Sequence, residues 1–175
     1  MEVGEICFFT ATINQWKHLL KEPAYCNVIL DSLQYLCSKD LADVFAFVIM
    51  PNHVHLIWRT NRLNGKETVQ GSFLKYTAHR FKQLLKQTQP SVLNQFAVDA
   101  KNKKYEFWQR DPLAVHLYTP EVAYQKLDYI HLNPLAEHWQ LATDPSDYFF
   151  SSASFYEKNE RRFTFIKDLR IEMTG

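Results

Sequence analysis

The chain has 175 residues, of which 46% are hydrophobic and 22% are charged, and its formal net charge is +1. This length and composition predict one globular domain with a substantial core. So small a net charge excludes a uniformly basic surface, and any basic patch that binds nucleic acid must be local. The three cysteines have no C-x-x-C spacing, which argues against a thiolate zinc site and against a secreted disulfide framework.

The N-terminal residues lack a basic segment followed by an apolar run, so we predict no signal peptide. No apolar stretch approaches the ~18 residues of a membrane span. We therefore expect a cytoplasmic protein with no membrane partner. Aromatic residues make up 15% of the chain, and such rings either pack in a core or stack on nucleobases.

In chain order, the hydrophobic pattern predicts strands alternating with helices. Residues 5–14 are rich in aromatic and β-branched side chains, and residues 27–38 carry apolar side chains at helical spacing. The turn signal Pro51-Asn52 separates two apolar runs, 43–50 and 53–60, which predicts a β-hairpin. The remaining predictions are a helix over 67–87, a loop over 88–103, strands over 104–110 and 113–118, and a helix over 119–133.

This order predicts an α+β fold of the ferredoxin-like or RNA-recognition-like type, with an antiparallel sheet and helices packed on one face. The other face of the sheet would be free for a site. We expect residues 1–140 to form this domain. Residues 141–175 would form a C-terminal tail that packs on the domain or extends it.

The strand predicted over 53–60 carries two histidines, His53 and His55. Because side chains alternate along a strand, both imidazoles should lie on one face, ~6–7 Å apart along the chain. Val54, Leu56 and Trp58 would then face a core. Two imidazoles on one side of a rigid strand can hold one cation.

The helix predicted over 119–133 has a core stripe and a polar flank. Ala123, Leu127 and Ile130 share one face, whereas Tyr129 and Asn133 are four residues apart on another, with Cβ atoms ~5–6 Å from each other. A helix laid beside the two histidines would deliver a phenol and an amide oxygen to the same ion. A half-buried tyrosine with a helix-terminal asparagine has the same spacing, so this alternative stays open.

Four sequence blocks occur in an order that resembles a known family. They are Met50-Pro-Asn-His-Val-His-Leu-Ile57, Phe107-Trp-Gln-Arg110, Tyr129-Ile-His-Leu-Asn-Pro134 and Asp147-Tyr-Phe-Phe-Ser-Ser-Ala153. Together they resemble the single-tyrosine HUH transposases, especially the branch called REP-associated tyrosine transposases. The resemblance covers roughly residues 3–156.

The resemblance implies roles for individual residues. His53, His55 and Asn133 would be metal ligands, and Tyr129, on the last long helix, would be the catalytic nucleophile. The implied reaction is nicking and strand transfer of single-stranded DNA, either linear or folded as a hairpin, through a 5′-phosphotyrosine. Imidazole and amide ligands suit a divalent ion, Mg²⁺ or Mn²⁺, and sequence does not choose between them.

Several residues are predicted to contact DNA. A basic stripe on the helix over 67–87 would hold phosphates, although a solvated helix face has the same pattern. The exposed Tyr76 and Trp108 would stack bases, although a core position for Trp108 is equally expected. The predicted contacts are Lys75, Arg80, Lys82, Trp108, Gln109, Arg110 and Lys126.

Two other functions remain open at this stage. A metal-dependent phosphoesterase would use the same histidines but would form no adduct on Tyr129. A non-catalytic nucleic-acid-binding module would use the aromatic residues and would need no metal. The sequence also leaves open whether the chain acts as a monomer or a homodimer, and whether the active site forms within one chain or across two.

Overall fold

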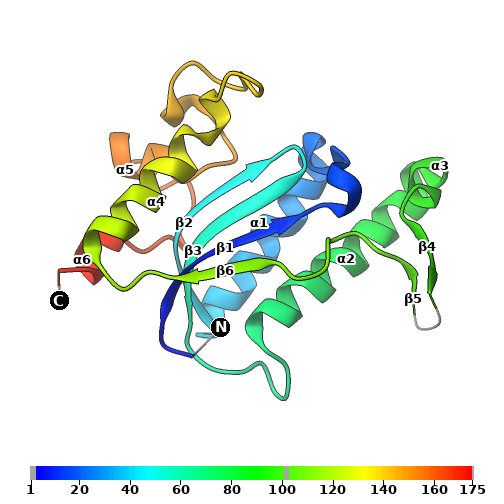
Figure 1. The fold of residues 1–175 in the computed structure, drawn as a ribbon, viewed down its shortest axis with the longest axis horizontal. Helices are drawn as coiled ribbons and strands as arrows, with labels where there is room; N and C mark the ends of the chain where they lie inside the picture. The colour runs from blue at the N-terminus through cyan, green and yellow to red at the C-terminus, as the bar shows by residue number, and fades with distance from the viewer. Residues whose placement is uncertain (1–2, 101–102, 175) are drawn as a thin grey trace.

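The computed structural model describes residues 3–100 and 103–174. Short 3-10 turns at 14–16, 19–21, 133–135 and 145–147 connect the longer elements. These longer elements are β1 (Ile6–Thr12), α1 (Pro23–Ser38), β2 (Ala42–Met50), β3 (His53–Thr60), α2 (Val69–Thr88), α3 (Pro90–Asn94), β4 (Ala97–Ala100), β5 (Lys103–Tyr105), β6 (Leu113–His116), α4 (Pro120–Leu132), α5 (Ala153–Lys158) and α6 (Leu169–Glu172) (Figure 1).

Within these residues, β2, β3, β1 and β6 form an antiparallel sheet in that order. The hairpin predicted around Pro51-Asn52 is present and joins β2 to β3. In the central pair, Thr12 lies opposite His53 and Thr10 lies opposite His55. The α+β fold with an antiparallel sheet, predicted from the order of elements, is confirmed.

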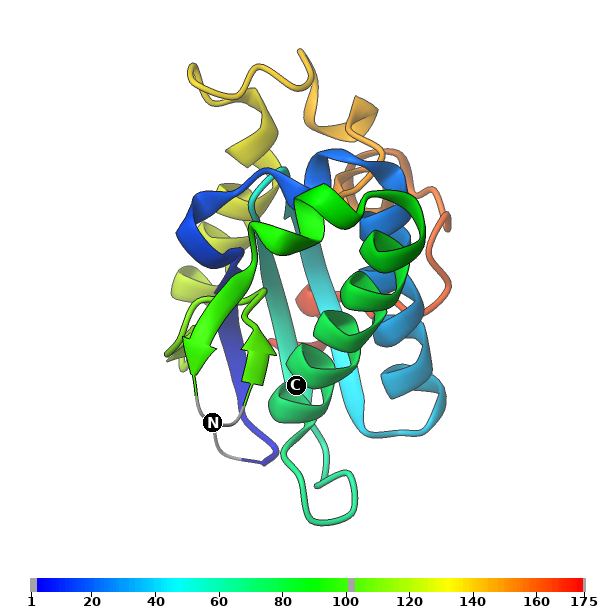
Figure 2. The ribbon, with the colours of Figure 1, turned by 90° about the vertical axis from the view of Figure 1, so that its right-hand side faces the viewer.

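The two faces of the sheet are covered by different helices. On one face, α1 and α2 bury side chains such as Leu33 and Phe73 against Phe9 and Trp58. On the other face, α4 lies along the sheet (Figure 2). The prediction left this second face free. It is partly covered because α4 has its own apolar stripe, which must be buried.

That stripe consists of Ala123, Leu127 and Ile130, as the helical spacing predicts, and it packs with Phe8 and Val48 of the sheet. Complete burial of a leucine or isoleucine side chain contributes about 1.5–3 kcal/mol, so this face fixes the helix firmly. Thr119 caps the helix by accepting a hydrogen bond from the Val122 N–H. The packing also fixes which way the polar flank of α4 points.

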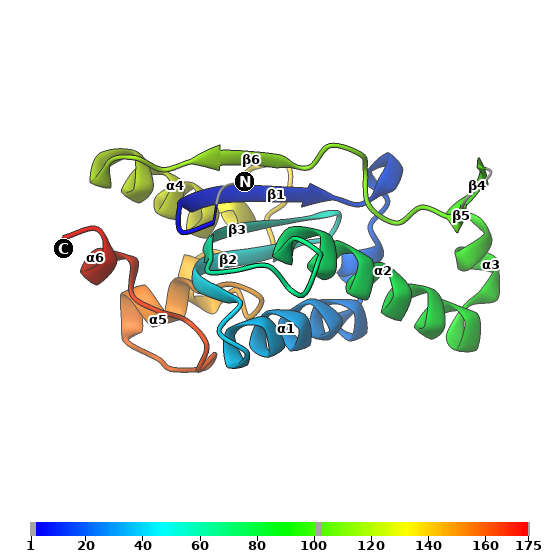
Figure 3. The same ribbon diagram turned by 90° about the horizontal axis from the view of Figure 1, so that it is seen from below.

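Two predicted segments differ from the structure. The 88–103 region, predicted as a loop, contains α3 and β4, although residues 101–102 lie outside the described residues. The strand predicted over 104–110 is shorter, because β5 ends at Tyr105 and Trp108 then makes an isolated bridge to Ile13. The small β4–β5 hairpin lies with α3 at one end of the molecule, opposite the end that holds α5 and α6 (Figure 3).

The segment after residue 140 packs along β2. Tyr148 and Tyr156 donate hydrogen bonds from their phenols to the carbonyl oxygens of Ile49 and Phe45, both at 2.8 Å. Arg59 forms ion pairs with Asp43 and, near the end of the described chain, Glu172. These contacts cover the edge of the sheet that β2 would otherwise expose. Among the described residues, no helix combines the length and the apolar character that a membrane crossing requires.

Candidate functional site

His53 and His55 lie on the same face of β3, with ring centroids 4.6 Å apart. The alternation along the strand sends Val54, Leu56 and Trp58 to the opposite face, where all three are fully buried. Because β3 pairs with β2 on one side and β1 on the other, it holds the two imidazoles side by side in the middle of the sheet. His55 is buried, and His53 is partly exposed.

Helix α4 brings Tyr129 to this pair. The Tyr129 ring lies 5.3 Å from the His55 ring and 5.9 Å from the Phe8 ring, centroid to centroid. One turn earlier, the Lys126 ammonium lies 4.9 Å from the Phe8 ring and 5.5 Å from the Tyr129 ring. The Tyr129 side chain is 48% exposed, so the phenol is accessible from solvent.

Asn133, one turn after Tyr129, completes the group. It ends α4 and lines a hollow of about 360 Å³. The structure thus places all four residues predicted for metal binding and nucleophilic attack at one location, with three of them on the wall of one pocket. The full lining is His53, Tyr129, Leu132, Asn133, Ala136, His138 and Trp139.

Both histidines are neutral at physiological pH. Burial lowers the pKa of His53 to about 4, and His138 contributes a smaller decrease through its charge. Burial also lowers the pKa of His55 to about 3, with additional decreases from His53 and Lys126. A neutral imidazole keeps the lone pair that a metal ion needs.

A divalent cation fits these residues. The Nε2 atom of His55 is buried and has no hydrogen-bond partner among the described residues, and a buried polar atom without a partner costs free energy. A cation facing the pocket would be bound by this nitrogen and also by the His53 and Asn133 side chains. No cluster of three His, Cys, Asp or Glu side chains occurs in the described part of the chain, so the third protein donor would be the Asn133 amide.

The basic stripe of α2 lies away from this site. Lys75, Arg80 and Lys82 belong to a helix that packs on the opposite face of the sheet. There Lys75 pairs with Glu67, and Lys82 lies over the Tyr105 ring. The structure therefore does not bring these predicted DNA contacts together with the residues predicted for catalysis.

The structure gives Trp108 a different role from the predicted one. Its side chain is 7% exposed, its ring packs against Phe73 and Phe81, and its indole N–H donates to the Thr77 hydroxyl at 2.9 Å. The prediction that this ring stacks on bases is wrong for this structure, because the ring has no free face. Trp108 belongs to the core between β1 and α2.

Its neighbours Gln109 and Arg110 are better placed. Both line a hollow of about 200 Å³ that also includes Thr10, the residue hydrogen-bonded to His55. Arg110 is exposed and pairs with Glu106 on the surface. With Lys126, these are the predicted DNA contacts that lie near the histidine pair.

Sequence reasoning missed three residues beside the site. Trp139 forms part of the pocket wall, with its ring 6.1 Å from that of His53. Asn52 and Thr10 each lie within hydrogen-bond distance of one histidine. A signal for Asn52 was present, since an amide directly before the His-x-His triplet can reach the first ring. No local pattern points to Trp139 or Thr10, because both are distant from the histidines in sequence and reach them only in the folded structure.

His116 is not part of the site. It lies opposite Cys7 in the β1–β6 pair, and Cys7 faces the α1–α2 core. The His116 ring stacks on the exposed Tyr118 instead.

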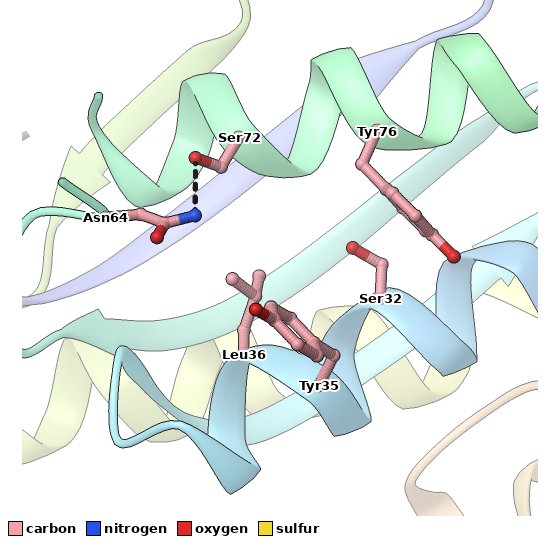
Figure 4. A pocket seen from close by; sticks show the side chains of 6 residues that line it. All are labelled: Ser32, Tyr35, Leu36, Asn64, Ser72 and Tyr76. Atoms are coloured by element: carbon pink, nitrogen blue, oxygen red, sulfur yellow. Dashed lines mark hydrogen bonds between the residues drawn. The ribbon is translucent and has the colours of Figure 1, made fainter. Parts of the chain in front are cut away.

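A third hollow, of about 310 Å³, lies between α1 and α2, on the far side of the sheet (Figure 4). Tyr35 and Tyr76 are exposed in it, and Asn64 donates a hydrogen bond to Ser72 at 3.1 Å. Tyr76, predicted to stack bases, is thus remote from the histidines. The hollow contains none of the residues predicted for catalysis.

With this geometry defined, comparison with known proteins gives a match at the level of structure. Neither a model of a protein family nor a curated protein sequence matches the chain. The chain is similar to a solved REP-associated tyrosine transposase bound to a REP hairpin, with a TM-score of 0.57 and 22% sequence identity over 86% of this chain and 78% of that one. It is also similar to a solved candidate transposase from Deinococcus radiodurans R1, with a TM-score of 0.44 and 15% identity over 74% of this chain and 91% of that one. The chain has the fold of the REP-associated transposase, and the resemblance drawn from the four sequence blocks is confirmed at that level.

Proposed function

We propose that the chain is a single-tyrosine HUH transposase of the REP-associated branch, which nicks and rejoins single-stranded DNA through a 5′-phosphotyrosine. The observation that carries the proposal is the position of Tyr129, whose ring lies 5.3 Å from that of His55 on a pocket shared with His53. A half-exposed phenol beside two neutral imidazoles favours chemistry over packing. The sequence blocks and the shared fold support the same assignment.

In this proposal His53, His55 and Asn133 hold a divalent cation, Mg²⁺ or Mn²⁺. When bound, such an ion polarises a phosphodiester and positions it for attack. The three side chains carry no negative charge, so they do not repel a DNA phosphate that enters the pocket. The Lys126 ammonium, 5.5 Å from the Tyr129 ring, favours negative charge on the phenol oxygen as it attacks.

The proposed step forms a bond between the Tyr129 oxygen and phosphorus while the bond from phosphorus to the 3′ oxygen breaks. The phenol gives up its proton, and the released 3′ oxygen takes up a proton to become a hydroxyl. Because the phosphotyrosine retains the ester, the 3′-hydroxyl of a second DNA end can attack it and restore the phenol. Strand transfer therefore needs no nucleotide hydrolysis.

Single-stranded DNA, either linear or as a hairpin, is the proposed substrate, and the transposase with the same fold was solved with a REP hairpin. On this chain, Trp139 offers a ring beside the histidines, and Arg110 offers a charge at the adjacent hollow. An aromatic ring and a cation are the groups that bind base and phosphate in single strands. Tyr129 lies beside the histidines of its own chain, and this supports the proposal that the site forms within one chain.

The test is incubation of the protein with labelled single-stranded and hairpin DNA in Mn²⁺ or Mg²⁺, followed by denaturing electrophoresis. The proposal predicts a denaturation-resistant adduct that Tyr129→Phe, His53→Ala and chelation each abolish. Turnover without an adduct, retained by Tyr129→Phe, would indicate a phosphoesterase. Metal-independent DNA binding without turnover would indicate a non-catalytic binding module.

A further inference from the structure

The turn between β2 and β3 holds the side chain of Asn52 against the first histidine. The amide oxygen of Asn52 lies 2.6 Å from Nδ1 of His53, and its amide nitrogen donates to the Trp16 carbonyl oxygen at 3.4 Å. Asn52 is buried, and its backbone carbonyl accepts a hydrogen bond from the Ile13 N–H at 2.8 Å. The amide is therefore fixed with its oxygen directed at the ring.

This contact determines which nitrogen of His53 carries the hydrogen. An amide oxygen only accepts, so Nδ1 of the facing ring must be the donor. A neutral imidazole has one N–H, and Nε2 of His53 is then left with its lone pair. Since His53 lines the pocket that contains Tyr129 and Asn133, the side of the ring available to a metal ion is Nε2.

Thr10 makes the equivalent contact with the second histidine. It lies directly opposite His55 in the β1–β3 pair, and its hydroxyl oxygen is 2.7 Å from Nδ1 of His55. The hydroxyl can accept the Nδ1–H hydrogen. Nε2 of His55 is the buried atom with no partner among the described residues, so it is the atom that requires a ligand.

We propose that Asn52 and Thr10 are positioning residues, which hold His53 and His55 as Nδ1–H tautomers and direct both Nε2 lone pairs at one cation. Partners of this kind orient metal-binding histidines in many metal sites, and their loss typically lowers metal affinity by about 10- to 100-fold. The metal-binding part of this inference rests on the function proposed above. The tautomers themselves do not depend on it.

The first experiment measures the tautomers in metal-free protein by two-bond ¹H–¹⁵N correlation of the histidine rings at neutral pH. We expect the Nδ1–H form for His53 and His55. Asn52→Leu should convert His53 to a mixture, whereas Asn52→Asp, which keeps an accepting oxygen, should retain the Nδ1–H form. Thr10→Val and Thr10→Ser form the matched pair for His55. An Nε2–H tautomer in the unmodified protein, or tautomers unchanged in Asn52→Leu and Thr10→Val, would overturn the inference.

The second experiment titrates the same variants with Mn²⁺ alone and follows binding by electron paramagnetic resonance. Asn52→Leu and Thr10→Val should weaken binding by about 10- to 100-fold, and Asn52→Asp and Thr10→Ser should restore most of it. Thermal unfolding of each variant identifies any loss caused by misfolding, and the two conservative variants keep the test decisive if the others do not fold. Expected tautomers without Mn²⁺ binding would contradict the proposed metal-dependent function and the metal-directing part of this inference, and would leave only the tautomer assignment standing. Mn²⁺ binding that is equal in all five proteins would contradict the positioning roles.

Discussion

Lys126 and Tyr129 lie one helical turn apart on α4, and the lysine ammonium is 5.5 Å from the centre of the tyrosine ring. If Tyr129 attacks phosphorus, this charge stabilises the negative charge that develops on the phenol oxygen. Lys126→Met should therefore slow adduct formation by about tenfold, which corresponds to ~1.4 kcal/mol of transition-state stabilisation. Lys126→Arg should retain most of the rate. Single-turnover kinetics with a hairpin substrate check this, and equal rates for the two variants would show that the charge has no role.

Trp139 is expected to bind a base beside the scissile phosphate, since its ring forms the pocket wall next to His53. Trp139→Ala should weaken binding of short single-stranded DNA by ~1–3 kcal/mol, the range for one stacked base. Trp139→Phe should recover part of the affinity. Fluorescence anisotropy measures both, with Tyr35→Ala as a control for an exposed ring on the far side of the sheet. Equal losses in Tyr35→Ala and Trp139→Ala would argue against a base-binding role.

Variants of Arg110 and Lys82 show which face of the sheet binds DNA, because the two residues lie on opposite faces. Arg110 lines the hollow next to Thr10, whereas Lys82 lies on α2 across the sheet. Arg110→Gln should lower the affinity for short single strands and reduce the slope of log K against log salt by about 0.7, the value for one phosphate contact. Lys82→Gln should change neither quantity. A larger effect of Lys82→Gln would place the DNA path along α2.

His131 makes stability depend on pH. It is buried, its Nε2 lies 2.8 Å from the Ser152 hydroxyl, and burial lowers its pKa to about 4. The unfolded chain protonates this ring near pH 6.5, whereas the folded chain resists protonation until about pH 4. Its contribution to stability is therefore complete above pH 6.5 and is lost as pH falls towards 4, by up to about 3 kcal/mol.

Urea unfolding across this pH range tests the contribution of His131. His131→Gln, which keeps a group able to hydrogen-bond Ser152, should show a smaller loss of stability between pH 6.5 and 4 than the unmodified protein. Identical pH profiles would mean that the ring titrates normally in the folded state. His53 and His55 have pKa values lowered in the same direction, so some acid sensitivity should remain in the variant.

The parts of the site that follow from local patterns could be predicted from sequence. The alternation along a strand places His53 and His55 on one face, and helical spacing places Tyr129 and Asn133 together. The meeting of these two pairs could not be derived from spacing, because it depends on α4 packing through Leu127 and Ile130. The family resemblance supplied that step.

Other features of the structure were not predicted, for related physical reasons. Helical periodicity identifies which face of α2 is basic, but it does not tell which face of the sheet the helix covers, so it did not show that Lys75 and Lys82 lie across the sheet from the histidines. DNA binding by these two lysines stays a prediction. Trp108 lies in one of the four blocks on which the family resemblance rests, yet its ring is held in the core by Phe73 and Thr77. The order of elements alone did not tell that α4 covers the face opposite α1 and α2, because the apolar stripe of α4 fits either face of a sheet equally well.

The most direct test of strand transfer by this chain is mass spectrometry of the peptide that contains Tyr129, after reaction with hairpin DNA in Mn²⁺ and nuclease digestion. We predict a nucleotide joined through its 5′-phosphate to the Tyr129 oxygen. This modification should be absent from Tyr129→Phe and from samples treated with chelator. An unmodified Tyr129 peptide from a reaction in which the DNA has been cleaved would contradict the phosphotyrosine mechanism.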